Sequence, residues 1–223
     1  MSAMLSCTCK ADGRQSTQTR EANNFNGIEV GQGIRTNVSI GDEERVEVVA
    51  PDDVIDLLTT EVSKGKLDIK WKKGSSIKST RHAVVNVTAK SLNSIVANSG
   101  ASVDCADTIV SSSFYLSSTS GAKVKVVVRA ENFDGKCSSG AKIEVGGSAQ
   151  NVGLNASSGA RFEADSLVAS NGEAHSSSGA LVNINATNTL KAEASSGGRI
   201  RYIGSPSMSD VSSSSGGSIS RMK

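Results

Sequence analysis

The chain is poor in aromatic residues, proline and histidine. Aromatic residues make up 3% of its 223 residues, and it has two prolines, two histidines and one tryptophan. A core drawn from this supply must be mainly aliphatic, which suits a thin stack of strands better than large rings do. His82 and His175 stand far apart in the sequence. We expect neither to have the cysteine or acidic partner of a catalytic relay.

The chain also lacks a strong net charge and a long apolar run. Its formal net charge is only +2, whereas nucleic-acid-binding domains typically carry a clear basic excess, so we expect no nucleic-acid partner. No stretch approaches the ~18–20 apolar residues of a membrane span. Because the apolar residues that are present recur periodically, disorder of the second half is also excluded.

One short phrase occurs seven times in the second half of the chain. It consists of two polar residues (the second a serine), a glycine, one small residue (alanine or glycine), and then alternating apolar and polar residues. The repeat glycines, 18 to 21 residues apart, are Gly100, Gly121, Gly140, Gly159, Gly179, Gly197 and Gly216. A fixed period of this length is typical of a solenoid, in which each repeat buries its apolar face against its neighbours.

The alternation after each glycine has period two, which indicates a strand and not a helix. The first, third and fifth residues after the glycine are small or apolar, so we expect them to point inward, and the second and fourth should face solvent. A shorter strand is expected before each glycine. The sequence therefore predicts an all-β protein, a single-stranded, right-handed parallel β-helix (β-solenoid) with coils of about 19 residues.

The chain divides into three parts. Residues 1–24 are polar without an apolar period, and we expect a flexible tether. Residues 25–90 predict an irregular β-rich section with a hairpin at Lys64-Gly65 and one short α-helix near residues 54–58. Residues 91–223 form the regular solenoid repeats.

Three motifs in the N-terminal section, taken in order, resemble a known family: Phe25-Asn-Gly-Ile-Glu-Val30, Ile40-Gly-Asp-Glu-Glu-Arg-Val-Glu-Val48 and Leu67-Asp-Ile-Lys-Trp-Lys-Lys-Gly74. With the Ser-Gly-Ala repeats, they are similar to the family called putative auto-transporter adhesin, head GIN domain, from about residue 25 to the C-terminus. The resemblance implies a secreted or surface-attached β-helical protein of Gram-negative bacteria and brings no catalytic residues with it. The chain departs from the family's naming motif, because Glu29 and Arg35 follow its two Gly-Ile pairs.

A basic column is expected on the outer face of the solenoid. The second residue after the repeat glycine is basic in four copies: Lys123, Lys142, Arg161 and Arg199. Like charges on neighbouring strands repel one another, so such a column lowers stability. We therefore interpret it as a binding site for an anionic polymer such as an acidic polysaccharide. The alternative is an ordinary solvated face, because Glu144 and Glu163 stand on the same strands and can neutralise it.

The serine before each repeat glycine forms a second column. Its hydroxyl groups can bond to one another and to the main chain at a tight corner, or they can present a flat array to a sugar or to ice. Regular Thr-x-Thr rows, which ice-binding solenoids resemble, are absent. The structural interpretation is therefore favoured.

Catalytic, metal and cofactor sites are not indicated. Some β-helical proteins process polysaccharides with clustered carboxylates, and the nearest approach to such a pair here is Asp104 with Asp107. A Gly-Gly-x-Gly-x-Asp calcium repeat is absent. We expect no enzyme activity, no metal and no cofactor.

The cysteines fall into two groups. Cys105 and Cys137 alternate with polar neighbours, as buried free thiols in a core do. Cys7 follows Met4-Leu-Ser, which resembles the end of a bacterial lipoprotein signal and makes Cys7 a candidate for lipid attachment. The alternative is an incidental cysteine in a tail.

These observations favour a non-catalytic, adhesin-like binding module, exported to the cell surface, outer membrane or periplasm, that presents a rigid face to a glycan or protein ligand. Two alternatives are a carbohydrate-processing β-helix (a polysaccharide lyase or hydrolase) and a purely structural envelope protein. The expected partners are an acidic polysaccharide or a surface protein of the envelope or a host. We expect contact with a membrane only through a lipid anchor. The strands at the two ends of the solenoid have unpaired edges, which would favour homo-oligomers.

Overall fold

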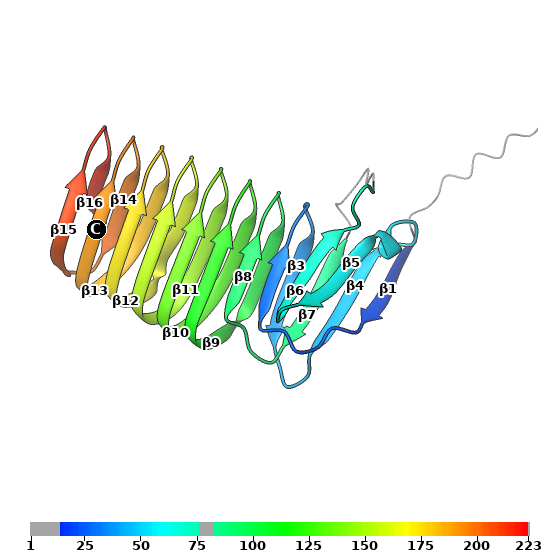
Figure 1. The fold of residues 1–223 in the computed structure, drawn as a ribbon. Helices are drawn as coiled ribbons and strands as arrows, with labels where there is room; N and C mark the ends of the chain where they lie inside the picture. The colour runs from blue at the N-terminus through cyan, green and yellow to red at the C-terminus, as the bar shows by residue number, and fades with distance from the viewer. Residues whose placement is uncertain (1–13, 76–82, 223) are drawn as a thin grey trace, which may run out of the picture.

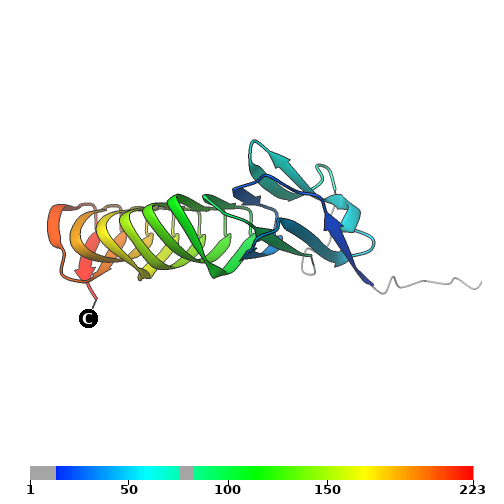
Figure 2. The same cartoon turned by 90° about the horizontal axis from the view of Figure 1, so that it is seen from below.

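The protein is a β-solenoid, as the sequence predicts. The structure, a computed structural model, describes residues 14–75 and 83–222. About seven turns are joined by parallel bridges between residues about 19 apart. The coils are stacked along one axis, with the irregular β-rich section at one end and the C-terminal coils at the other (Figures 1 and 2).

The described residues form sixteen strands and one short 3-10 helix. They are β1 (Gln15–Arg20), β2 (Gly27–Val30), β3 (Arg35–Ile40), β4 (Arg45–Pro51), η1 (Ile55–Leu57), β5 (Leu58–Ser63), β6 (Lys66–Trp71), β7 (Val84–Ala89), β8 (Ser94–Ala97), β9 (Ser102–Ser118), β10 (Lys123–Cys137), β11 (Lys142–Ala156), β12 (Arg161–Ser176), β13 (Leu181–Ala194), β14 (Arg199–Ile203), β15 (Ser207–Ser213) and β16 (Ser218–Arg221).

Each regular coil is one long, bent strand, where the sequence predicted two separate ones. β9 to β13 are 14 to 17 residues long and pair in parallel with the next coil along most of their length. The pairing register shifts between Lys125 and Val127 and between Glu144 and Gly146. These irregularities let one strand change direction and serve two faces without losing most of its ladder.

The expected division into inward and outward residues is confirmed. In three successive coils the first, third and fifth residues after the glycine are at most 3% exposed: Ala141, Ile143, Val145, Ala160, Phe162, Ala164, Ala180, Val182 and Ile184. A short aromatic stack joins this aliphatic core. Phe114 stacks on Phe133 with ring centres 6.2 Å apart, and Phe133 meets Phe162 edge-on at 6.5 Å.

The repeated Ser-Gly pair turns the chain by adopting left-handed backbone. Ser139 has φ 54° and Gly140 φ 68°, and the other repeat pairs are alike. Two successive residues with positive φ define a type I′ turn. The Gly140 N–H donates to the Ser158 carbonyl of the next coil at 3.0 Å, and equivalent bonds follow along the stack. The serines of this column therefore have a structural role, which comes chiefly from their left-handed main chain and its carbonyl groups and less from their hydroxyl groups.

One coil of the N-terminal section lies out of sequence order. β2 pairs in parallel with both β6 and β8, and β3 pairs in parallel with both β7 and β9. Residues 27–40 are thus inserted between a coil formed by β6 and β7 and a coil formed by β8 and the start of β9 (Figure 1). The corner of the inserted coil, Gln32-Gly33, is also left-handed, and the Gly33 N–H donates to the Ser99 carbonyl at 2.9 Å. This corner extends the main-chain ladder of the repeats.

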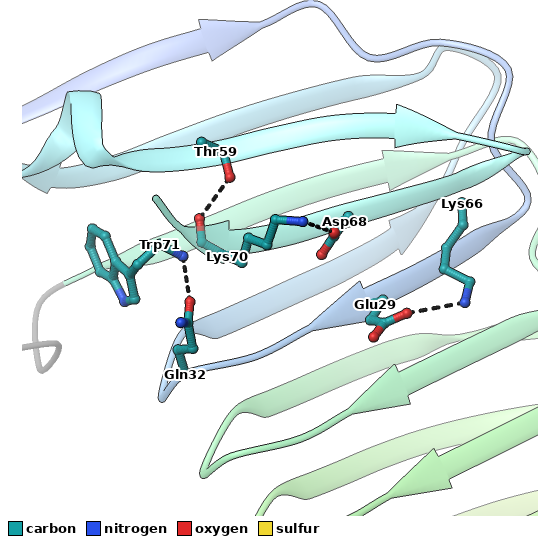
Figure 3. A network of polar contacts seen from close by, with 7 residues as sticks. All are labelled: Glu29, Gln32, Thr59, Lys66, Asp68, Lys70 and Trp71. Carbon is teal, nitrogen blue, oxygen red and sulfur yellow. Dashed lines mark hydrogen bonds and ion pairs between the residues drawn. The ribbon is translucent and has the colours of Figure 1, made fainter. Parts of the chain in front are cut away.

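Side chains fasten the inserted coil to β6. Lys66 Nζ lies 3.0 Å from Glu29 Oε2, and the Trp71 main-chain N–H donates to Gln32 Oε1 at 2.7 Å (Figure 3). On its other side β6 pairs antiparallel with β5, which confirms the predicted hairpin. The solenoid therefore continues into the irregular section without a separate core.

Two expectations for the N-terminal section are wrong. Residues 15–20, assigned to a flexible tether, form β1, which pairs antiparallel with β4. Its side chains alternate between half-buried and exposed but are polar, so no apolar period revealed the strand. The expected α-helix is the three-residue 3-10 helix η1, because the chain is already extended at Leu58. Residues 1–13, including Cys7, lie outside the described residues.

No helix within the described part of the chain is both long enough and apolar enough to cross a membrane.

Candidate ligand-binding groove

An open groove of about 800 Å³ runs along the outside of the solenoid. It begins at Asn93 and Ser94 beside the inserted coil and ends at Thr189 and Lys191 on β13. Its lining comes from the arm of each strand that precedes the Ser-Gly corner, on β8 to β13. Since neighbouring strands lie about 4.8 Å apart, the groove extends for ~24 Å along the axis.

One wall of the groove is a ladder of asparagine side chains. Asn132, Asn151 and Asn171 lie in register on β10, β11 and β12. Asn151 Nδ2 donates to Asn132 Oδ1 at 3.0 Å, and Asn171 Nδ2 donates to Asn151 Oδ1 at 3.1 Å. Thr189 continues the ladder, because its hydroxyl donates to Asn171 Oδ1 at 2.8 Å. An amide NH₂ has two donors, so an asparagine that uses one in the ladder keeps the other for a ligand.

The opposite wall is the next outward column of the same strands. From coil to coil it consists of Ser94, Tyr115, Asp134, Gly153, Glu173 and Lys191. Lys136 Nζ lies 5.7 Å from the centre of the Tyr115 ring, a cation–π contact that holds the ring in place. Gly153 has no side chain and leaves a gap in the middle of this wall.

The floor of the groove lies between the two walls and is mainly backbone. Phe114, Phe133 and Val152 belong to this column and are at most 3% exposed, so their side chains point into the core. Gly172 stands in the same column, where a Cβ would lie 2.9 Å from Ile184 Cδ1. Parallel ladders hold each floor segment on both sides. The groove therefore has a floor fixed by the ladders and walls that carry polar side chains.

Ion pairs set the charge at the C-terminal end of the groove. His175 Nε2 lies 3.0 Å from Glu173 Oε1, and His175 Nδ1 lies 3.0 Å from Glu193 Oε2, so the expectation that His175 lacks acidic partners is wrong. Lys191 Nζ lies 3.3 Å from Asp210 and 3.4 Å from Glu173. The hydrogen bond with His175, aided by Lys191, holds the pKa of Glu173 below its usual value. Glu173 is therefore a firmly ionised carboxylate, and Lys191 carries little uncompensated charge.

The expected basic column forms, but acidic side chains occupy its centre. Lys123, Lys142 and Arg161 lie in register on successive coils. Lys142 Nζ lies 2.5 Å from Glu144 Oε1 and 3.0 Å from Glu163 Oε2. These hydrogen bonds raise the pKa of Lys142. Arg161 Nε also lies 3.9 Å from Glu163, so the face is one of mixed charge.

Arg199 does not continue this basic column directly. Leu181 stands between Arg161 and Arg199 in the register of the strands. A shallow hollow of about 160 Å³ adjoins Lys123 and Lys142. The structure thus aligns the candidate residues but does not gather all of them in one site, and their role in binding stays a prediction.

The other candidates have structural roles. The Asp107 carboxylate accepts the main-chain N–H of Ile40 at 2.9 Å. Cys105 and Cys137 are buried free thiols, as predicted. Burial raises the pKa of Cys105 to about 11 and that of Cys137 to about 12, which makes both poor nucleophiles. Among the residues that the structure describes, no group of three or more His, Cys, Asp and Glu side chains is placed to hold a metal ion.

Sequence reasoning missed the asparagine ladder, although its signal is present. Asn132, Asn151 and Asn171 each stand eight residues before a repeat glycine, and this common offset is enough to align them in one column. The groove itself has no such signal, because it depends on how each long strand bends.

The fold places the chain among the single-chain β-solenoids. Its sequence matches the family described as "Putative auto-transporter adhesin, head GIN domain" over residues 24–206, and the chain belongs to this family. No curated protein matches it.

Solved structures share the fold along nearly the whole chain. A putative adhesin from Bacteroides fragilis NCTC 9343 has a TM-score of 0.89 at 19% identity, covering 95% of this chain and 99% of that one. A putative adhesin from Parabacteroides distasonis ATCC 8503 has a TM-score of 0.77 at 20% identity, with 95% and 98% covered. A putative lipid binding protein from the same organism has a TM-score of 0.75 at 18% identity, with 95% and 98% covered. At these identities the similarity concerns the fold.

Proposed function

We propose that the protein is a non-catalytic binding module of the cell surface or periplasm that holds a glycan or protein ligand on the outside of its solenoid. The observation that carries the proposal is the groove of about 800 Å³, whose polar walls repeat from coil to coil on a rigid floor. Membership of an adhesin family supports the same function. A rigid groove suits binding, because little conformational entropy is lost when the ligand docks.

The chemistry of the carboxylates argues against a glycan-cleaving enzyme. Glycosidic cleavage needs a general acid whose pKa is raised, whereas the pKa of Glu173 is lowered by its hydrogen bond with His175. Asp107, one of the two carboxylates singled out in the sequence, is engaged by the Ile40 main chain. A purely structural role would leave the groove without a ligand.

The name of one structural neighbour raises lipid binding as an alternative. A lipid chain needs an apolar lining, but the side chains of Phe114 and Phe133 face the core and not the groove. Amides, a phenol and carboxylates line the walls instead. This lining favours a ligand rich in hydroxyl groups over an acyl chain.

Export and anchoring belong to the same proposal. We expect the chain to fractionate with the outer membrane or periplasm, and Cys7 to carry lipid if it anchors the protein. Metabolic labelling with a fatty acid, compared with a Cys7→Ser variant, tests the anchor. Labelling of the variant equal to that of the parent would contradict it.

The binding function is tested by exposing immobilised neutral and acidic polysaccharides, envelope proteins and matrix proteins to the purified chain. We expect retention on at least one of them, with no new reducing ends released from any polysaccharide. Heat-unfolded protein is the control for non-specific retention. Release of reducing ends would replace the proposal with a carbohydrate-processing enzyme, and retention on none would leave a structural role.

A further inference from the structure

We infer that the ligand of the groove is one extended, neutral polysaccharide chain lying parallel to the solenoid axis. The inference rests on the proposed binding function and specifies its ligand class and site. It moves the site from the basic column of Lys142 and Arg161 to the asparagine-lined groove. It also replaces the acidic polysaccharide expected from the sequence with a neutral one.

The shape of the groove calls for a linear polymer. Equivalent wall positions recur on successive coils of β8 to β13, at a spacing of about 4.8 Å set by the strand ladder. A compact ligand would use only one or two of these rows. A regular, extended chain of similar repeat length would present a like group to every row over ~24 Å.

The asparagine wall matches the hydroxyl groups of sugars. Asn132, Asn151 and Asn171 hold one another at 3.0 and 3.1 Å, which fixes their amide planes before a ligand arrives. Each amide keeps an N–H donor for a ligand, and the Oδ1 atoms of Asn132 and Asn151 each keep a lone pair. Asn171 Oδ1 already accepts from Asn188 and Thr189. A sugar hydroxyl can both donate to and accept from such amides. Because the amides are already ordered by the ladder, binding costs little side-chain entropy.

The charges of the groove select a neutral chain. Asp134 and Glu173 stand on the opposite wall, and the pKa of Glu173 is lowered by His175. Lys191, the cation that lines the groove, is paired with Asp210 and Glu173. A polyanion would meet two carboxylates in this lining, and the neighbouring cation, Lys136, lies over the Tyr115 ring. Carboxylates, by contrast, readily accept hydrogen bonds from sugar hydroxyls.

Gly153 provides a direct way to close the groove. It lies in the middle of the carboxylate wall, and a Cβ built there meets no atom nearer than 4.0 Å. Its φ is not in the left-handed region, so a side chain fits the backbone and must occupy the groove. Gly146, on the same strand but outside the groove lining, also accepts a Cβ in ordinary contact, with Ser166 Cβ at 3.6 Å.

The experiment compares Gly153→Trp with its matched control Gly146→Trp. Affinity electrophoresis and calorimetry would use dextran, mannan, xylan and laminarin as neutral probes, with polygalacturonate and heparin as acidic probes. We expect a neutral polysaccharide to bind the parent chain and Gly146→Trp equally, and to bind Gly153→Trp at least roughly tenfold more weakly. Asn151→Ala should weaken binding of the same probe while circular dichroism and thermal melting show all variants folded.

Three results would overturn the inference. The first is neutral binding that Gly153→Trp leaves intact. The second is binding of acidic probes alone, lost on Lys142→Glu with Arg161→Glu, which would keep the binding function but return the site to the basic column. The third is binding of proteins but of no polysaccharide, which also keeps the binding function. Failure to retain any polysaccharide or protein would instead remove the proposed function itself.

Discussion

The ring of Phe162 occupies the space that a side chain at position 135 would need. A Cβ atom on Gly135 would lie 2.3 Å from Phe162 Cζ and 3.0 Å from Phe133 Cε1. Gly135 is paired with Leu116 and Leu154 on the adjacent coils, so a large residue is normal at this level of the stack. The core thus fits one large ring by leaving out one side chain, as close packing requires.

This relationship predicts a strong coupling between the two positions. Gly135→Ala should lower the free energy of unfolding by about 1–3 kcal/mol, because it forces the ring of Phe162 to move. Phe162→Leu alone should also destabilise by leaving a void. The double variant should be less destabilised than the sum of the two, with a coupling of about 0.5–3 kcal/mol. Urea midpoints and m-values measure this, and simple additivity would contradict the packing account.

Thr36 offers a stabilising substitution. Its side chain is fully buried between Val85 and Val103 in the register of the strands. Its hydroxyl has no hydrogen-bond partner among the residues that the structure describes. Thr36→Val should therefore raise the unfolding free energy by about 1 kcal/mol, because an unpaired buried hydroxyl is costly. Thr88→Val is the control: the Thr88 hydroxyl lies 3.1 Å from the Ser39 hydroxyl, so its loss should not raise the unfolding free energy. If Thr36→Val is less stable than the parent chain, the unpaired hydroxyl of Thr36 is not a cost to the fold.

The left-handed corner predicts opposite effects of two substitutions at one position. Ser139 has φ 54°, a region that asparagine tolerates well and β-branched residues avoid. Ser139→Asn should raise the melting temperature slightly, and Ser139→Val should cost about 1–2 kcal/mol. Gly140→Ala should cost a similar amount through backbone strain alone, since a Cβ there meets nothing within 4 Å. Equal melting temperatures for the asparagine and valine variants would show that the corner tolerates other conformations.

The ion pairs of the basic column predict a dependence of stability on pH. The hydrogen bond from Lys142 lowers the pKa of Glu144 in the folded state. A lowered folded pKa gives stability that is fully present above the unfolded pKa, about 4.3, and is lost as pH falls through the folded pKa. Lys142→Met should make this acid-side loss shallower by at most about 1 kcal/mol, because the pairs are solvent-exposed. Urea unfolding of the parent chain and Lys142→Met from pH 6 to pH 3 measures this loss, and Lys123→Met in the same column is the control. If the unfolding free energies of all three proteins fall in parallel with pH, the Lys142 ion pairs do not cause the loss.

The buried thiols predict slow chemistry in the folded state. The pKa of Cys105 is raised to about 11 and that of Cys137 to about 12 by burial, so few thiolates exist near neutral pH. In a Cys7→Ser, Cys9→Ser chain, Ellman's reagent should react slowly with the folded protein and rapidly after denaturation. Two thiols reacting at once without denaturant would mean that the coils open readily.

The regular coils could be predicted from the sequence because their rule is local. A left-handed corner favours glycine, and alternation along a strand decides which residues are buried. The offsets of Ala141, Ile143 and Val145 from Gly140 therefore predict core positions, and the structure buries all three. The same offset also aligns Asn132 with Asn151.

Neither the groove nor the order of the N-terminal coils could be predicted in this way. Periodicity shows that Lys142 faces outward, but the position of Glu144 and Glu163 around its ammonium depends on side-chain geometry. The strand β1 carries no apolar period at all, and only its pairing with β4 reveals it.

The length of the coil, its corner and the residues that face the core can be read from a single repeat, because each follows from backbone sterics and the burial of apolar side chains. The tertiary structure alone decided that residues 27–40 lie between β6–β7 and β8–β9 and that the bent strands form a groove beside the asparagine ladder. Both depend on contacts between residues far apart in the chain. Such contacts depend on which strand edges and side chains meet in the folded protein, and no pattern within one repeat specifies these partners.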